Sequence, residues 1–167
     1  MKHPYKALLA VALSVGFQTT VHGQDASYAI KLMTPETALK AALAGLKKCR
    51  DAGYQVAVAV VDRTGQTQVV LRDRFAGMHT PDAAVSKAWT AVSFKSNTTQ
   101  FAEATQSGKA ASGIRHIPNV LAIGGGMMIE AGGSLYGAIG ISGAPSGEAD
   151  DMCARAGIAA VTEDLEM

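Results

Sequence analysis

Apolar residues recur at the spacing of an α-helix in several stretches of the chain. The first helix is expected to start at Thr34, a residue type favoured at helix N-caps and followed here by proline and glutamate. It should run to about Ala52, before a glycine. The same order of cap, proline and acid returns later, so a second helix is expected to start at Thr80 or Pro81 and to end near Lys95. A short third helix is predicted over residues 98–106, and a loop followed by a final helix over residues 143–161.

Runs of β-branched and apolar residues between these helices predict strands. Residues 54–62 (YQVAVAVVD) are apolar on both alternating faces, and after the turn RTGQ residues 67–73 (TQVVLRD) return as the second strand of a hairpin. Residues 120–142 hold three short apolar runs separated by glycines, which predict three more strands, whereas residues 107–119 predict a loop and residues 24–33 a leader or a short strand. The order α-β-β-α-α-β-β-β-α indicates an α+β fold, with an antiparallel five-stranded sheet flanked by helices.

The first 23 residues have the layout of a secretory signal peptide. Lys2 and Lys6 precede an apolar run from Ala7 to Phe17, and small residues lead up to Gly23, where we expect cleavage. The apolar run is shorter than the roughly 20 residues that span a bilayer, so no membrane span is expected here. Residues 24–167 are therefore expected to form a single exported domain, periplasmic or extracellular.

Removal of this peptide would change the charge and the set of histidines. The full chain has 15 basic and 14 acidic residues, and loss of Lys2 and Lys6 leaves 13 against 14, a formal charge of −1. A chain without a basic block does not indicate nucleic-acid binding. Of the four histidines only His79 and His116 would remain, so any imidazole chemistry would depend on one of these two.

The two cysteines, Cys49 and Cys153, both lie in the part that is expected to be exported. Oxidising surroundings favour a bridged pair over free thiols. Helical spacing puts Cys49 on one face with Leu46, and Cys153 on one face with Ala156, so both side chains are expected to point toward a core. We therefore predict a disulfide between them, with two buried free thiols as the alternative.

Several common kinds of site find no support in the sequence. The glycines of GGGMMIEAGG precede strand-like residues rather than a helix, and no Gly-Lys-Ser/Thr follows, so a phosphate-binding loop is not indicated. Nucleophile-elbow and zinc-finger spacings are absent from the sequence. Asp62, at the end of a strand, is expected to cap a turn, and Glu148, Asp150 and Asp151 suit the positive start of the last helix.

The stretch RFAGMHTPDAAVSKAW is the strongest candidate for binding chemistry. His79 is expected just before the second helix, where the helix dipole disfavours an imidazolium and so leaves a lone pair for a metal. Met78 and its neighbours add an apolar surface, and Arg72, Arg74 and Lys87 are cations able to pair with carboxylates. An apolar surface with one neutral histidine and flanking cations is typical of a haem site, with iron on the imidazole and propionates on the cations. An ordinary loop histidine is the alternative.

Three segments of the sequence resemble the GlcG/HbpS family of haem-binding proteins. They are VAVAVVDRTGQTQVVLRD, AGMHTPDAAVSKAWTAVSF and GGGMMIEAGGSLYGAIGISG, which occur in the family's order and cover about residues 34–160. The resemblance implies an antiparallel sheet flanked by helices in a profilin-like three-layer arrangement, and assembly as a homo-oligomer. It also implies a tetrapyrrole ligand, because the family includes exported haem binders and domains appended to corrinoid adenosyltransferases.

The resemblance leaves the axial ligand of a haem open, because ligation varies within the family and this chain has RFAG where many members have DGA. We expect His79 to be the ligand. His116 is its competitor, and Met78, Met127 and Met128 are candidates for a weak second ligand. The resulting hypothesis is an exported haem-binding protein that acts as a carrier, a buffer or a component of a sensor.

A second hypothesis is an enzyme or accessory protein that acts on a small organic acid or a corrinoid, with Lys87 and Asp62 in its cleft. The alternative for Lys87 is a packing lysine bonded to a strand carbonyl. Binding is favoured over catalysis, and a structural oligomer without a ligand is a third interpretation.

Overall fold

The structure is a computed structural model, and it describes residues 26–167. The predicted signal peptide, residues 1–23, lies outside the described residues. Residues 26–34 form no regular element before the first helix. The elements are α1 (Pro35–Asp51), β1 (Ala57–Asp62), β2 (Thr67–Arg72), α2 (Thr80–Phe94), α3 (Thr98–Ala104), the 3₁₀ helix η1 (Ser112–His116), β3 (Gly126–Ala131), β4 (Ser134–Ser142), α4 (Gly147–Ala159) and α5 (Thr162–Glu166).

The sheet is antiparallel throughout, with the strand order β2-β1-β4-β3. Val58 of β1 pairs with Leu71 of β2 on one side and with Ile141 of β4 on the other. The predicted hairpin of β1 and β2 is confirmed, and β1 is buried along its whole length, as its unbroken apolar sequence predicts. The central pair of strands is therefore β1 and β4; β4 ends beside the site described below, and β1 begins there.

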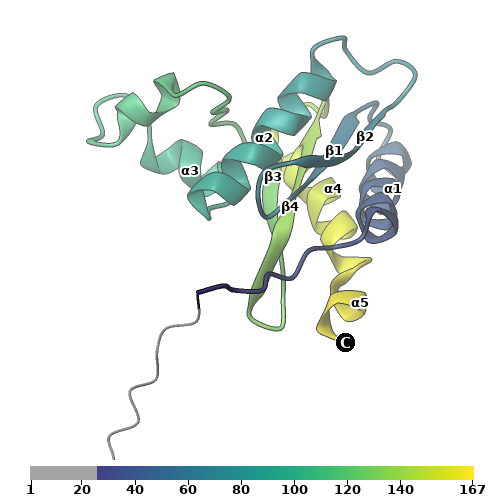
Figure 1. The fold of residues 1–167 in the computed structure, drawn as a ribbon. Helices are drawn as coiled ribbons and strands as arrows, with labels where there is room; N and C mark the ends of the chain where they lie inside the picture. The colour runs from purple at the N-terminus through teal and green to yellow at the C-terminus, as the bar shows by residue number, and fades with distance from the viewer. Residues whose placement is uncertain (1–25) are drawn as a thin grey trace, which may run out of the picture.

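Alternate side chains of β1 point to opposite faces of the sheet, and different helices cover these two faces. Val58 and Val60 belong to a buried cluster with residues of α1 and α4. Ala57, Ala59 and Val61 lie on the opposite face and pack against α2. The molecule therefore has helices on both faces of the sheet, with α2 on one face and α1 and α4 on the other (Figure 1). This confirms the predicted α+β class.

Glycines in the sheet let α2 lie directly against it. A Cβ at Gly140 of β4 would overlap the carbonyl oxygen of Ala84 and lie 2.8 Å from the amide nitrogen of Ala88. A Cβ at Gly126 of β3 would overlap the carbonyl oxygen of Lys87. Helix and sheet backbones approach this closely only where no side chain intervenes. These two glycines thus set the height of α2 above the sheet, and with it the position of Lys87.

A disulfide joins α1 to α4 on the other face, as predicted. Cys49 and Cys153 form the bond, with their Cα atoms 5.5 Å apart, and both side chains are fully buried. The two cysteines are part of the same buried cluster as Val58 and Val60. The bond therefore fastens the two helices beneath the sheet.

The prediction of a fifth strand is wrong. Residues 120–123 form no strand, and β3 is the last strand on its side of the sheet. Side chains at the start of α3 satisfy this edge instead. The amide of Met128 donates to Asn97 Oδ1 at 3.0 Å, and the amide of Gly126 donates to Thr98 Oγ1 at 2.8 Å. Because these side chains accept from edge N–H groups, the edge needs no further strand there.

Two further differences from the predicted elements concern short segments. The expected loop at residues 107–119 contains η1, and a last helix, α5, follows α4. The segment with α3 and η1 extends away from the layers of helix and sheet (Figure 1). Within residues 26–167, none of the helices combines the length and apolar character that crossing a membrane requires.

Candidate functional site

A pocket of about 640 Å³ opens where α2 and α4 begin, beside the end of β4. Its size lies within the range of roughly 300–1,000 Å³ that is common for small-molecule sites. Ala83, Leu121 and Ile123 contribute apolar wall, and the connection from β4 to α4, residues 142–147, forms another side. Buried Lys87 lines the inner end of the pocket, whereas exposed His79 lies at its mouth.

His79 stands directly before α2, as predicted. It occupies the N-cap position with helical backbone angles, and its side chain forms no capping hydrogen bond. The hydroxyl of Thr80 donates to the carbonyl oxygen of Gly77 at 2.7 Å, which closes the turn beneath the imidazole. A Cβ at Gly77 would lie 2.8 Å from Cε1 of His79, so the ring rests against a position without a side chain. The imidazole has no hydrogen-bond partner in the part of the chain that the structure describes.

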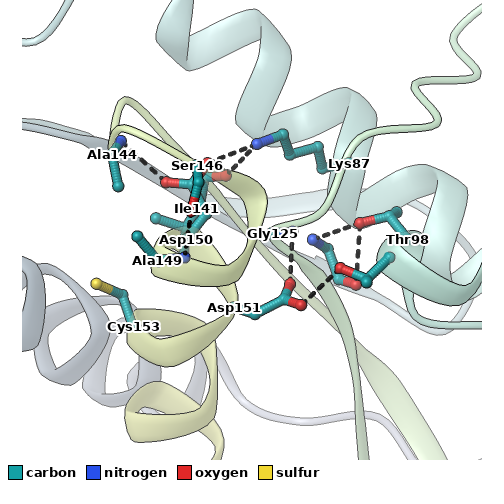
Figure 2. Close-up of polar contacts among 12 residues, drawn as sticks. Lys87, Thr98, Gly125, Ile141, Ala144, Ser146, Ala149, Asp150, Asp151 and Cys153 are labelled. Carbon is teal, nitrogen blue, oxygen red and sulfur yellow. Dashed lines mark hydrogen bonds and ion pairs between the residues drawn. The ribbon is translucent and has the colours of Figure 1, made fainter. Parts of the chain in front are cut away.

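Lys87 extends from α2 past the end of β4 and pairs with Asp150 of α4, on the other face of the sheet (Figure 2). Its Nζ donates to Asp150 Oδ2 at 2.7 Å and to the carbonyl oxygen of Ile141 at 2.9 Å. Both charged side chains are only 4% exposed. The hydrogen bond to a strand carbonyl, the alternative expected for Lys87, is therefore one of its two contacts. The other contact, the buried ion pair with Asp150, was not predicted from the sequence.

The two adjacent acids at the start of α4 have different partners. Asp150 Oδ1 accepts from the amide of Ala144, while Asp151 accepts from the amide of Gly125 and the hydroxyl of Thr99, each at 2.6 Å (Figure 2). Burial raises the pKa of Asp150 above its ordinary value, and the hydrogen bonds from Lys87 and from the Ala144 amide offset part of that rise. Both carboxylates thus tie α4 to other elements, in addition to the predicted role of complementing the helix dipole.

The loop before His79 is held by arginine contacts. Arg72 donates through its guanidinium to the carbonyl oxygen of Ala76, and Arg50 of α1 donates through Nε to Asp73 Oδ2 at 2.7 Å. The hydrogen bonds from Arg50 lower the pKa of Asp73, although burial opposes this effect. Arg72 therefore has a structural partner, whereas the guanidinium of Arg74 forms no hydrogen bond within residues 26–167.

The other predicted ligands do not line the pocket. Met78 is 89% exposed and lies outside it. His116 ends η1 and lines a separate depression of about 270 Å³ together with Arg115 and Thr105. Met127 and Met128 are partly buried residues of β3 that pack on opposite faces of the sheet. The structure thus brings His79 and Lys87 to one pocket and leaves His116 elsewhere.

Asp62 caps the turn between β1 and β2, as predicted. Its Oδ1 accepts from the amide and hydroxyl of Thr64 and from the amide of Gln66, and its Oδ2 accepts from Gln68. Burial raises the pKa of Asp62, but these hydrogen bonds outweigh it and leave the pKa below its ordinary value. Asp62 does not line the pocket of Lys87, so the two do not form a joint catalytic pair.

Residues 26–167 contain no group of three or more histidine, cysteine, aspartate or glutamate side chains arranged to hold a metal ion. The residues that sequence reasoning missed are Leu121, Ile123, Asp150 and the start of α4. The acidic residues near position 150 were the available signal, but their spacing alone did not connect them to Lys87.

Comparison with known proteins agrees with this architecture. A crystal structure of a double mutant of HbpS from Streptomyces reticuli superposes with a TM-score of 0.76 at 36% sequence identity, covering 93% of this chain and 97% of that one. The crystal structure of a PduOC–heme complex superposes with a TM-score of 0.73 at 31% identity, covering 78% of this chain and 95% of that one.

A curated relative of known activity is similar over a shorter part of its own length. The corrinoid adenosyltransferase PduO of Salmonella typhimurium is 34% identical over 120 residues, which are 71% of this chain and 35% of that protein. This chain therefore spans about a third of the relative's length. A sequence model of the family described as haem degrading protein HbpS-like matches residues 33–159. The chain thus belongs to the HbpS-like family, which the resemblance to GlcG/HbpS proteins predicted.

Proposed function

We propose that this protein binds haem through His79 and serves as an exported haem carrier, buffer or sensor component. The observation that carries the proposal is the exposed imidazole of His79, which has no hydrogen-bond partner among the described residues and stands at the mouth of an apolar-walled pocket. Two further facts support it: the family is described as haem degrading, and one similar structure is a heme complex.

The residues around the pocket fit a haem. A neutral imidazole is a common proximal ligand of haem iron, and Leu121 and Ile123 offer apolar contacts to a porphyrin ring. The guanidinium of Arg74 is exposed and available to a propionate, whereas that of Arg72 is engaged by its own loop. A bound haem would supply the iron chemistry, and the chain would supply ligation, exclusion of water and charge.

Export is part of the proposal and rests on two features. Residues 1–23 have the order of charge, apolar run and small residues that a signal peptide requires. The buried disulfide between Cys49 and Cys153 suits an oxidising compartment. We also propose a homo-oligomer, which light scattering of the purified protein would test.

Titration of the haem-free protein with hemin tests the proposal. We expect the unaltered chain to bind hemin saturably and to show a Soret band. His79→Ala should lose that band or shift it strongly, whereas His116→Ala, the matched control, should change little. An unchanged spectrum and affinity in His79→Ala would remove His79 as the ligand. Absence of saturable binding in the unaltered chain would overturn the haem proposal as a whole.

A corrinoid-related accessory role is the second candidate. It is favoured by the 34% identity to a corrinoid adenosyltransferase over 120 residues. The separation of Asp62 from the pocket of Lys87 argues against the enzymatic form of this alternative. Thermal stabilisation by cobalamins together with no response to hemin would favour the corrinoid role over haem.

A further inference from the structure

The buried ammonium of Lys87 has more hydrogen-bond donors than acceptors. A lysine ammonium carries three N–H groups. Two of them are used, by the carbonyl oxygen of Ile141 and by Asp150 Oδ2, and the side chain is 4% exposed. The third has no acceptor among residues 26–167. A buried donor without an acceptor is unfavourable, so a partner from outside the chain is expected there.

The unused donor belongs to a side chain that lines the pocket, so a ligand can reach it from solvent. Lys87 and Asp150 are buried, yet both line the same pocket as exposed His79. At about 640 Å³ the pocket is far larger than the roughly 30 Å³ share of a single water molecule. A pocket of this size admits a ligand larger than water that carries an oxygen acceptor for this donor.

A second donor lines the pocket at the start of α4. The amide of Gly147 has no acceptor within the described residues, because α4 begins there and the hydroxyl of Ser146 accepts from Ala149 instead. The first turn of a helix also carries a partial positive charge that favours an anion. Asp150 balances the charge of Lys87, so Lys87 contributes its third N–H group, and Gly147 adds a directed backbone N–H group at the same pocket.

The acidic residues nearby leave this part of the pocket open to an anion. Both carboxylate oxygens of Asp150 are occupied, one by Lys87 and the other by the amide of Ala144. Asp151 is engaged by Gly125 and Thr99 and does not line the pocket. Glu148 does not line it either. The pocket wall thus presents one paired carboxylate and no unpaired one among the described residues.

We propose that the inner end of this pocket binds a carboxylate group, through the third N–H of Lys87 and the amide of Gly147. The carboxylate belongs either to a propionate of haem or to a small free organic acid. The first source rests on the proposed function, and the second is independent of it. Apolar Ala83 and Leu121 would contact the carbon skeleton that carries the carboxylate.

Two sets of ligands tell these sources apart in the full chain. In the first arm, sodium propionate and sodium succinate are added at fixed ionic strength, with sodium chloride as reference, and amide shifts are followed by ¹H–¹⁵N NMR. In the second arm, affinity for hemin is compared with affinity for hemin dimethyl ester, which has no free carboxylate. Ala83→Phe fills the pocket without touching the ion pair, and Ser93→Phe, on an exposed turn of α2 outside this pocket, is its control.

We expect at least one arm to respond. A free acid should shift amides at residues 79–87 and 142–150, and Ala83→Phe but not Ser93→Phe should abolish the shifts. A haem propionate should make hemin bind roughly tenfold more tightly than its ester or better, the size of one charge-assisted hydrogen bond. The double variant Lys87→Met/Asp150→Asn removes the ion pair but keeps an acceptor for the Ala144 amide, and it should lose that preference.

The outcomes separate this inference from the haem proposal. Equal affinity for hemin and its ester, with no response to free acids, would overturn the carboxylate site and leave haem binding intact. A response to free acids in a protein that does not bind hemin would keep the carboxylate site and remove haem. A hemin preference that persists in Lys87→Met/Asp150→Asn would also overturn the assignment to Lys87.

Discussion

The disulfide between Cys49 and Cys153 should contribute a large part of the stability of this domain. The bond joins residues that are 104 positions apart in the sequence. In the chain-entropy treatment, closing a loop of this length stabilises the folded state by about 4.7 kcal/mol, and measured values for native disulfides fall in the range of about 2–5 kcal/mol. Whole domains are stable by only about 5–15 kcal/mol. Reduction should therefore leave the domain marginally folded.

Urea unfolding with and without reductant tests this magnitude. The single tryptophan, Trp89, is half-buried on α2 and reports unfolding by fluorescence. With a urea m-value of about 2 kcal/mol/M, reduction should lower the unfolding midpoint by roughly 1–2.4 M. The double variant Cys49→Ala/Cys153→Ala is the control, because its curve should not respond to reductant. Coincident curves for the oxidised and reduced protein, or an intact mass that reduction and alkylation leave unchanged, would refute the reasoning.

Three other substitutions test the contacts around the site. Gly140→Ala should lower the free energy of unfolding in urea by at least about 2 kcal/mol, because the added methyl group overlaps the backbone of α2. A loss below about 0.5 kcal/mol, the scale of a neutral surface change, would contradict that packing. Lys87→Met should lower the free energy of unfolding by about 3–5 kcal/mol, because it leaves the buried carboxylate of Asp150 without its partner. Adding Asp150→Asn should recover part of that loss, and a double variant less stable than Lys87→Met would contradict the pairing. Because the pKa of Asp73 is lowered in the folded state, its contribution is present above its ordinary pKa of 3.8 and lost as pH falls below it. Asp73→Asn should therefore flatten the loss of stability as the pH falls from about 4 toward the lowered pKa, and an unchanged pH slope would argue against the Arg50 contact.

Local sequence signals predicted the elements whose boundaries depend on local chemistry. Thr34 caps α1 by accepting from the amide of Thr37, and the proline after it fits the first turn. The run of valine and alanine from residue 57 is a fully buried strand. The second helix begins at Thr80, but the residue at its N-cap is His79, and the Thr80 hydroxyl bonds back to the preceding turn instead. The same sequence pattern thus gave two different cap geometries.

Long-range pairing explains what the sequence pattern could not predict. A fifth strand was expected because residues 120–123 are apolar, yet Asn97 and Thr98 satisfy the edge of β3 from a different part of the chain. The same holds at the pocket, where Lys87 and Asp150 meet across 63 positions of sequence. Hydrophobic periodicity identifies which face of an element is buried, but it does not tell which buried polar groups will meet. His79 was identifiable because its signal, a histidine before a helix start, is local.

Haem binding through His79 is tested most directly by the absorption spectrum of protein purified from cells that were supplied with a haem precursor. The unaltered chain should copurify with haem and show a Soret band, and His116→Ala should do the same. His79→Ala should be purified with little or no haem while keeping its fold, as judged by the Trp89 fluorescence of the native protein. A His79→Ala protein with the same Soret band and haem content as the unaltered chain would contradict the central claim.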